Sequence, residues 1–284
     1  MANTGWFKKK FSRALLLYRS RGSKWLLTSA FAEIPFFKNL LLKGLNKISS
    51  FTFKPLHPLV GIHSDQLWSE RKIVLKEITM DYLKNPITVL EIGAWMGLGS
   101  TQLWKNLLPS SKLVIADAWS PLEGGDGING LNLMSLFQRT AFNSTITVAD
   151  DIASKNINVA IFRGKSLLTL SFLEEKSFDL IYIDASHIYP DIKFDIQSAK
   201  RLIKDKGMIC GDDLDLKITE GLIAVAKKNI ELDLYLLPNG EAIHPGVLLA
   251  VYEEFEEVNQ RNGTWWVYKN GESYTTEFTD LKRK

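Results

Sequence analysis

The sequence predicts an α/β fold with a mostly parallel sheet and helices on both of its faces. From residue 87 onward, short apolar and β-branched runs alternate with segments of helical length. The runs are almost continuously apolar, as expected of strands that are covered on both faces of a sheet. These predicted strands are 87–92, 112–116, 159–162, 178–183 and 207–210.

The composition is that of a folded globular protein. The chain has 284 residues, of which 45% are hydrophobic, and this suits one domain with an extension. It has one cysteine, so no disulfide can form within the chain and a reducing compartment is permitted. Cys210 lies in an apolar run and is expected to be a buried thiol. We therefore expect a cytoplasmic protein.

The charges divide the chain into a basic arm and a mildly acidic body. Up to residue 54 there are 11 Lys and Arg residues and one acid, Glu33, whereas the remainder carries 24 basic and 31 acidic residues. Pro55 and Pro58 mark an extended linker after the arm. We expect a basic amphipathic helical arm and linker over 1–60, a folded domain over 64–270 and a polar tail over 271–284.

The sequence of the basic arm is compatible with two kinds of binding partner. Its apolar residues fall at helical spacing with lysines and arginines between them, as in helices that lie on an anionic membrane surface. Amphipathic helices also pack on a protein body or a partner subunit, and that alternative has equal weight. No apolar stretch reaches the about 20 residues of a membrane span. The density of Leu and Phe and the absence of a known motif argue against nucleic acid.

A helix is predicted before the first strand. Ser64 has the residue type of an N-cap and is followed by an acid in the first turn. Apolar residues then recur at helical spacing, and Asn85 followed by Pro86 ends the pattern.

A glycine-rich turn follows the first predicted strand. Gly93 and Gly97 permit a tight turn and a close approach of the backbone to a ligand, and Glu91 ends the strand before them. The spacing is Gly-x-x-x-Gly and not the Gly-x-Gly-x-x-Gly of dinucleotide sites. The turn therefore disfavours a nicotinamide oxidoreductase and suits a ligand smaller than a pyrophosphate. An ordinary strand–helix turn is the alternative.

Polar residues also follow the second and third predicted strands. Asp117 stands 26 residues after Glu91, at a position where an acid can accept hydrogen bonds from both hydroxyls of a ribose. Ser166 follows the third strand and is a weaker candidate for contact with an adenine edge. Ligands of parallel sheets bind outside the carboxyl ends of the strands, so these residues are expected at one edge.

The ordered set of motifs resembles a known family. The stretches 89–93 (VLEIG), 178–189 (FDLIYIDASHIY) and 207–213 (GMICGDD) are similar to class I methyltransferases of the macrocin O-methyltransferase and cephalosporin-hydroxylase-like group. The resemblance covers roughly residues 64–270. It implies a Rossmann-like doubly wound, mostly parallel seven-stranded sheet, with an N-terminal helical extension here. It also implies S-adenosylmethionine as cofactor, on residues Glu91, Gly93, Gly97, Asp117 and Ser166.

The same resemblance implies a divalent cation. Asp184 ends the fourth predicted strand, and Asp212 and Asp213 end the fifth, so three carboxylates are expected to converge. Clustered carboxylates repel one another unless a cation or protons neutralise them. All-oxygen ligation would suit Mg²⁺ or Ca²⁺. The alternative is a solvated loop that begins at Asp212.

Two histidines are candidates for the base of an O-methylation. His187 follows Asp184 by three residues, and His244 lies in a loop that is expected to lead into a strand over 247–252. A structural role for His187 has equal weight. The glycine-rich segment after Asp117, with four glycines between 124 and 130, is expected to be a substrate loop. Trp119 is expected near the adenine or a sugar ring, and Trp265 and Trp266 in a last edge strand.

The main hypothesis is a metal-dependent O-methyltransferase that acts on a small-molecule or glycan acceptor, such as a sugar or a hydroxylated natural product. The alternative is a non-catalytic, membrane-tethered binding protein that retains the fold as a scaffold. The carboxylate triplet argues against that alternative. A homo-oligomer and a monomer are both open.

Overall fold

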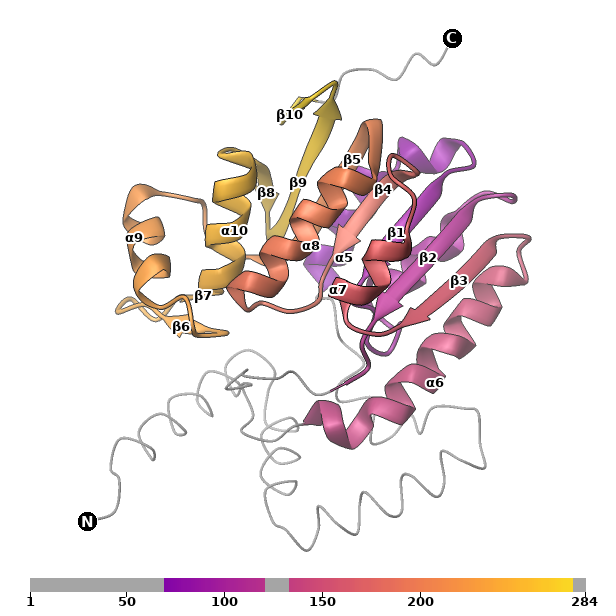
Figure 1. Cartoon of the computed structure of the whole chain (residues 1–284), viewed down its shortest axis with the longest axis horizontal. Helices are drawn as coiled ribbons and strands as arrows, with labels where there is room; N and C mark the ends of the chain where they lie inside the picture. Colours follow the sequence, from indigo (N-terminus) through magenta and orange to yellow (C-terminus); the bar gives the residue numbers. More distant parts are fainter. Residues whose placement is uncertain (1–68, 121–132, 278–284) are drawn as a thin grey trace, which may run out of the picture.

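The computed structural model describes residues 69–120 and 133–277. The basic arm, the glycine-rich segment 121–132 and the last residues lie outside the described part, and so does the predicted N-cap Ser64. Within it, one large sheet runs through the molecule and helices cover both faces (Figure 1). The strands of this sheet are β1 (Thr88–Ile92), β2 (Lys112–Asp117), β3 (Asn158–Arg163), β4 (Phe178–Ile183), β5 (Ile203–Leu214), β8 (Asn259–Arg261), β9 (Gly263–Asn270) and β10 (Ser273–Thr275).

The sheet has the strand order β10-β9-β5-β4-β1-β2-β3, and β8 pairs with β9 beside this path. Strands β3, β2, β1, β4 and β5 are parallel to one another, whereas β9 is antiparallel to β5. The chain leaves β1 toward β2 and β3 and then returns to the other side of β1 with β4. The switch in strand order therefore lies between β1 and β4, where ligands of such sheets bind.

The helices form one layer on each face. The first layer contains α5 (Ser69–Thr79), the 3₁₀ helices η1 (Tyr82–Lys84) and η2 (Ser100–Asn106), and α6 (Leu133–Ala153). The second contains α7 (Ser166–Thr169), the 3₁₀ helix η3 (Leu170–Phe172), α8 (Tyr189–Leu202), α9 (Glu220–Lys228) and α10 (Pro245–Phe255). A small separate sheet pairs β6 (Tyr235–Leu236) with β7 (Ala242–Ile243).

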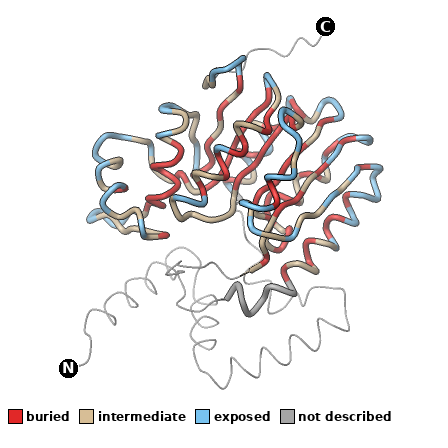
Figure 2. The backbone as a smooth tube through the Cα atoms, in the orientation of Figure 1, coloured by how far each residue is buried: buried red, intermediate tan, exposed pale blue. Residues whose placement is uncertain are grey.

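Strand β1 shows how the sequence builds two cores. Successive side chains of a strand point to opposite faces. Val89 accordingly packs in the cluster with α5, η2 and α6, whereas Leu90 and Ile92 pack in the cluster with α8 and α10. The buried positions follow the central strands and the inner sides of the helices (Figure 2). Both faces of the central strands are therefore buried, as their continuous apolar runs predict.

The C-terminal part differs from the sequence prediction in three places. The expected strand over 247–252 is instead the helix α10, which is buried against α8 and β5. Pro245 occupies the first turn of this helix, where its missing N–H group costs nothing. Because the apolar run is buried on all sides, it has no periodicity that separates a strand from a buried helix.

The other two differences concern the sheet edge. Trp265 and Trp266 belong to β9, which lies between β5 and β10 and is not the last strand. The edge strand is β10, which comes from the polar stretch expected to be a tail after residue 270. Among the described residues, no helix is long and apolar enough to cross a membrane.

Candidate active site

The predicted ligand-binding edge is assembled around the junction of β1 and β4. The backbone N–H of Asp184 donates a 2.8 Å hydrogen bond to the carbonyl of Ile92, and the turn beginning at Gly93 packs directly on Asp184. A Cβ on Gly93 would lie 1.9 Å from the carbonyl oxygen of Asp184, and Gly93 has a φ of +88°. Only glycine permits both this conformation and this contact.

Asp117 closes the glycine-rich turn. It is the last residue of β2, and its carboxylate accepts hydrogen bonds from the backbone N–H groups of Ala94 and Trp95 at 2.8 and 2.7 Å. Its other oxygen accepts from Trp119 N at 2.6 Å. Burial raises the pKa of Asp117 above its ordinary value, although these three donors lower it. The structure thus places Asp117 against the glycine-rich turn, at the carboxyl end of β2.

Gly97 and Trp119 hold the far end of the same turn. Gly97 has a φ of +68°, and a Cβ there would lie 3.1 Å from the Cα of Thr145 in α6. Thr145 Oγ1 and Trp119 Nε1 both donate hydrogen bonds to the carbonyl of Trp95. Trp119 packs edge-on against Phe142 and is 1% exposed. The expectation that Trp119 would flank a bound ring is therefore wrong, because its indole is part of the core.

The side chain of Glu91 lies in the core and not at the edge of the sheet where a ligand is expected. It alternates with Leu90 and Ile92 along β1, so its side chain points into the layer of α5, η2 and α6, and it is fully buried. It accepts hydrogen bonds from Ser100 Oγ and, at 3.1 Å, from Trp104 Nε1. Burial raises the pKa of Glu91 to about 7. Glu91 thus binds two side chains of η2, the helix that follows the glycine-rich turn.

Ser166 begins α7, directly after β3 and at the same sheet edge as Asp117. Its hydroxyl interacts with the carboxyl of Asp195 in α8. Burial raises the pKa of Asp195 to about 7, and the Ser166 hydroxyl lowers it. Neither oxygen of Asp195 makes a hydrogen bond to a described residue, so Ser166 stays available at the carboxyl end of β3, where the adenine contact is predicted.

The acidic residues at the end of β5 lie in a bulge. The pairing of β5 with β9 shifts between Gly211 and Leu214, so Asp212 and Asp213 are the residues at the irregularity. Asp213 has a φ of +64°, which is uncommon for a non-glycine residue and frequent at functional sites.

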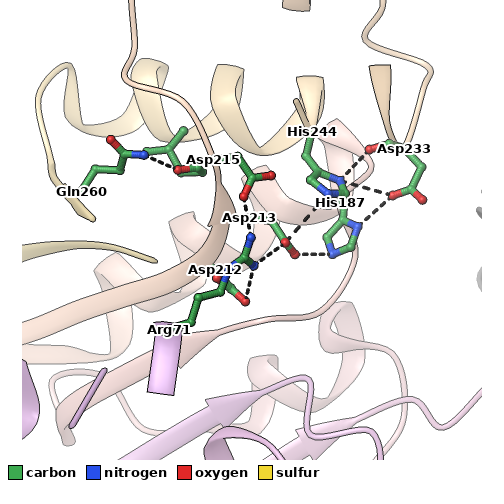
Figure 3. A network of polar contacts seen from close by, with 9 residues as sticks. Arg71, His187, Asp212, Asp213, Asp215, Asp233, His244 and Gln260 are labelled. Carbon is green, nitrogen blue, oxygen red and sulfur yellow. Dashed lines mark hydrogen bonds and ion pairs between the residues drawn. The ribbon is translucent and has the colours of Figure 1, made fainter. Parts of the chain in front are cut away.

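Arg71 of α5 is the residue that sequence reasoning missed. Its guanidinium contacts Asp212 Oδ2 at 2.7 Å, Asp213 Oδ1 at 2.8 Å and Asp215 Oδ1 at 2.5 Å (Figure 3). Burial alone would lower the pKa of Arg71, but the three carboxylates raise it above its ordinary value. The available signal was its spacing from Leu75, which places Arg71 on the buried side of the predicted helix.

Two histidines and Asp233 form the other half of the cluster (Figure 3). His187 Nε2 lies 2.8 Å from Asp213 Oδ2, and His187 Nδ1 lies 2.8 Å from Asp233 Oδ1. His244 Nδ1 lies 2.7 Å from the main-chain oxygen of Asp233, and the two imidazole rings stand edge to face at 4.3 Å. Gly246 permits this approach, because a Cβ there would lie 2.2 Å from the carbonyl oxygen of His187. Asp233 follows no predicted strand and had no signal in the sequence.

The protonation of the cluster follows from these contacts. Burial alone would lower the pKa of His187, but the charge of Asp213 and the hydrogen bonds to Asp213 and Asp233 raise it well above its ordinary value. Burial would raise the pKa of Asp213, yet the neighbouring histidines and Arg71 hold it well below its usual range. Desolvation and the charge of Asp213 raise the pKa of Asp184 to about 7.

The predicted cation ligands are only partly brought together. Asp184, His187 and Asp213 offer donor atoms within 4.8 Å of one another, and so do Asp213, Asp215 and His244. Asp212 belongs to neither set. One of its oxygens contacts Arg71, and the other is buried with no hydrogen-bond partner among the described residues. One nitrogen of Arg71 contacts both Asp212 and Asp213, so Asp212 lies beside the two groups without belonging to either.

Comparisons with known proteins found similarities to methyltransferases. Residues 90–214 match a family described as a methyltransferase domain. The chain is similar to an O-methyltransferase of tomaymycin synthesis from Streptomyces achromogenes, at 18% identity over 70% of this chain and 78% of that chain, with a TM-score of 0.45. It is also similar to an O-methyltransferase from Bacillus cereus in complex with SAH, at 15% identity over 86% and 97% of the chains, with a TM-score of 0.46. No curated protein matches.

The family match covers the glycine-rich turn, Asp117, Ser166, Asp184 and both acidic residues of the β5 bulge. The described part of the chain has the parallel strand order with an antiparallel β9 and helices on both faces of the sheet. Residues 90–214 are therefore similar to a methyltransferase domain, and they lie on an α/β sheet of this topology.

Proposed function

We propose that this protein is an O-methyltransferase for a hydroxylated small molecule, such as a sugar or another polyhydroxylated natural product. The observation that carries the proposal is the juxtaposition of the glycine-rich turn with the acid–histidine cluster. Gly93 packs on Asp184, and Asp184 is grouped with His187 and Asp213. A methyl donor held on the turn would thus lie next to groups that can position and deprotonate a hydroxyl.

S-adenosylmethionine would supply an electrophilic sulfonium methyl group at this edge. We assign the binding of the cofactor to the Gly93–Gly97 turn, to Asp117 for the ribose and to Ser166 for the adenine. The turn is pre-formed, because Asp117 and Thr145 already hold its backbone. Rigid positioning of donor and acceptor contributes much of the rate in such a transfer.

His244 is the better placed of the two candidate bases. The main-chain oxygen of Asp233 can only accept a hydrogen bond, so Nδ1 of His244 carries the proton there. Its Nε2 is 3.8 Å from Asp213 Oδ1, beyond hydrogen-bonding distance, and can accept a proton. As the substrate oxygen bonds to the methyl carbon, the carbon–sulfur bond breaks with its electrons on sulfur and His244 Nε2 receives the hydroxyl proton.

A divalent cation would fit beside Asp184 and Asp213. The donor atoms converge there, and the buried Asp212 oxygen shows that the cluster offers more acceptor sites than Arg71 and His187 satisfy. Such a cation would lower the pKa of a substrate hydroxyl and fix its position. The prediction of Mg²⁺ or Ca²⁺ assumes that all protein ligands are oxygen atoms. The identity of the cation therefore depends on which residue is the third protein ligand.

The proposal is tested by calorimetric titration of S-adenosylmethionine into the full chain, followed by an acceptor screen. We expect binding that Asp117→Ala weakens, and release of S-adenosylhomocysteine with acceptors among glycosylated and polyhydroxylated compounds. A chain that binds no S-adenosylmethionine, with or without divalent cations, would contradict the proposal and favour a scaffold role. If the protein bound S-adenosylmethionine but methylated amines or thiols and no hydroxylated acceptor, the cofactor assignment would stand and O-methylation would be contradicted.

Attachment of the basic arm to an anionic membrane remains a prediction from the sequence, because residues 1–54 lie outside the described part. Liposome flotation of the full chain and of a variant without residues 1–54 separates the two alternatives. Co-flotation of the full chain alone would support the membrane surface. Absence of both proteins from the lipid fraction would leave packing on a protein body as the role of the arm.

A further inference from the structure

We propose that an apolar patch on the second helix layer docks the folded domain on an anionic lipid surface, together with the basic arm. The patch consists of Leu167 and Leu168 of α7 and Phe172 of η3. The proposal adds a membrane contact on the folded domain to the one predicted for the arm. It depends neither on the cofactor nor on the reaction that is catalysed.

The first observation is that exposed apolar side chains are concentrated in one short segment. Leu167, Leu168 and Phe172 are 60%, 62% and 80% exposed. The other exposed large hydrophobic side chains of the described residues are Ile73, Met80 and Leu108. Those are scattered, and scattered apolar residues on a surface are normal. The patch is different, because its three members all lie within the span 167–172.

The second observation is that this segment is apolar on its outer side as well as on its inner side. Leu170 is fully buried in the cluster with α8 and α10, and Leu173 packs against the same cluster. Leu168 and Phe172 are four residues apart in successive helical turns, so they lie on one face. A helix at a protein surface normally presents polar residues on its outer side. The outer side of this segment therefore has the composition of a surface that contacts a second apolar partner.

The third observation is that the backbone of the segment is held in place. Arg201 of α8 donates hydrogen bonds to the carbonyls of Leu170 and Leu173, at 2.7 and 3.1 Å. Ser171 Oγ donates to the carbonyl of Leu168 at 2.7 Å. Helix α7 lies beside α8 in the second layer (Figure 1). The apolar side chains are therefore presented to solvent by a fixed element and not by a frayed end.

The size of the patch favours lipid over a second copy of the chain. A stable protein interface buries about 800 Å² on each partner, which is more than three exposed side chains can supply. A lipid surface has no such minimum, because binding grows with each apolar side chain that enters the interface and with the attraction of nearby cations to anionic lipids. A small apolar patch is therefore sufficient as one of two membrane contacts.

The charges around the patch agree with an anionic partner. Between residues 163 and 176, the exposed basic residues Arg163, Lys165 and Lys176 outnumber the exposed acids Glu174 and Glu175. The basic arm adds 11 Lys and Arg residues against one acid up to residue 54. This excess of positive charge near the patch disfavours the arm as the segment that covers it, and it favours an anionic lipid surface that attracts both.

The test is flotation of the full chain with phosphatidylcholine vesicles that contain or lack phosphatidylglycerol. We expect the wild type to bind the vesicles that contain phosphatidylglycerol. The triple variant Leu167→Ser, Leu168→Ser, Phe172→Ser should bind them about tenfold more weakly or worse, because the inserted apolar area is lost. The matched control is Ile73→Ser with Met80→Ser, two side chains that are 56% and 58% exposed on another part of the surface. It should change binding by less than about threefold.

A fluorescent label reports whether the patch itself enters the lipid. Cys210 is buried, so an environment-sensitive dye can be attached selectively to Phe172→Cys and, as a control, to Met80→Cys. We expect the emission of the dye at position 172 to shift to the blue on anionic vesicles and that of the dye at position 80 to stay unchanged. Circular dichroism melting checks the fold of each variant, and the label remains decisive if the triple serine variant does not fold.

Three results would overturn the proposal, each in a recognisable way. Equal binding of the wild type and the triple serine variant would assign the membrane contact to the arm alone. A dye at position 172 that is shielded before vesicles are added, and that does not respond to them, would show that protein covers the patch; loss of this shielding on dilution would identify a second copy of the chain. Absence of the wild type from the lipid fraction would exclude a membrane partner, whereas S-adenosylmethionine binding and methyl transfer are measured separately and could still hold.

Discussion

Arg71 is the residue on which the charge balance of the site depends. Its guanidinium contacts three carboxylates, and its side chain is 11% exposed. A cation from the layer of α5 thus neutralises acids that the sequence reasoning had assigned to a metal ion. Removal of one partner from a buried ion pair is more damaging than loss of an exposed pair, because the remaining charges stay desolvated.

Replacement of Arg71 by methionine should therefore destabilise the protein strongly. We expect Arg71→Met to lower the free energy of unfolding by about 3–5 kcal/mol. Chemical denaturation followed by circular dichroism gives this value. The matched control is Arg261→Met, which breaks the exposed ion pair between Arg261 and Glu77 and should cost less than about 1 kcal/mol. Equal effects of the two changes would contradict a central role for Arg71.

Glu91 makes stability depend on pH. Burial raises its pKa in the folded protein to about 7, above the ordinary value of 4.5, so the fold favours the neutral acid. The stability that this group contributes is fully present below about pH 4.5 and is lost as the pH rises through about 7. With about 1.4 kcal/mol for each unit of pKa, the loss is roughly 3 kcal/mol.

The variant Glu91→Gln resembles the neutral acid and should remove this dependence. We expect the difference in unfolding free energy between the variant and the wild type to shift in favour of the variant as the pH rises from 5 to 8. Denaturant titrations at several pH values measure the difference. A difference that stays constant over this range would show that Glu91 does not titrate with a raised pKa.

At the scale of elements, the junction of β1 with β4 places the glycine-rich turn next to the acid–histidine cluster. Gly93 and Asp184 follow paired parallel strands, and the backbones of their two loops are in contact. The sequence indicated both loops as functional. Their contact depends on the register of β1 against β4, which pairs Ile92 with Ile183.

A comparison of two glycines should separate steric contact from backbone conformation. Gly93 has a φ of +88° and Gly240 a φ of +87°, but a Cβ on Gly240 would meet nothing within 4 Å. Gly240→Ala should cost only the left-handed conformation, about 1–2 kcal/mol. Gly93→Ala should cost clearly more and should weaken S-adenosylmethionine binding, as measured by denaturation and calorimetry. Equal costs would show that Gly93 is needed for its φ alone.

At the scale of the whole molecule, the proposed cofactor site spans several strands of one sheet. Asp117, the Gly93 turn and Ser166 follow β2, β1 and β3, and binding across them should stabilise the sheet as a unit. A ligand at 100 times its dissociation constant contributes about 2.7 kcal/mol to the folded state. For a domain of this size, that corresponds to a rise in Tm of about 5–10 °C.

Thermal melting with and without S-adenosylmethionine measures this shift. We expect S-adenosylmethionine to raise the Tm of the wild type by that amount and to raise the Tm of Asp117→Asn less at the same concentration. The asparagine retains one acceptor oxygen for the backbone donors of the turn, so the variant keeps much of the local structure. A full shift in Asp117→Asn would contradict the assignment of Asp117 to the ribose.

The sequence by itself determined the parallel sheet and indicated where the candidate site lies. Apolar runs that are buried on both faces have a pattern that local sequence records directly, and the ends of such strands are where ligand-binding residues lie. Gly93, Asp117, Asp184 and Asp213 could be found in this way. The apolar run of α10 could not be assigned, since a fully buried segment has no periodicity to separate a helix from a strand.

Only the tertiary structure decided which groups surround the acids. Arg71 precedes Asp213 by 142 residues, and Asp233 lies 46 residues after His187, so neither pair has a local signature. Asp212 and Asp213 lie at the β5 bulge, and Gly246 lets its helix approach the backbone of His187. Local sequence records the burial of a segment, whereas the pairing of charges across layers depends on how those layers pack.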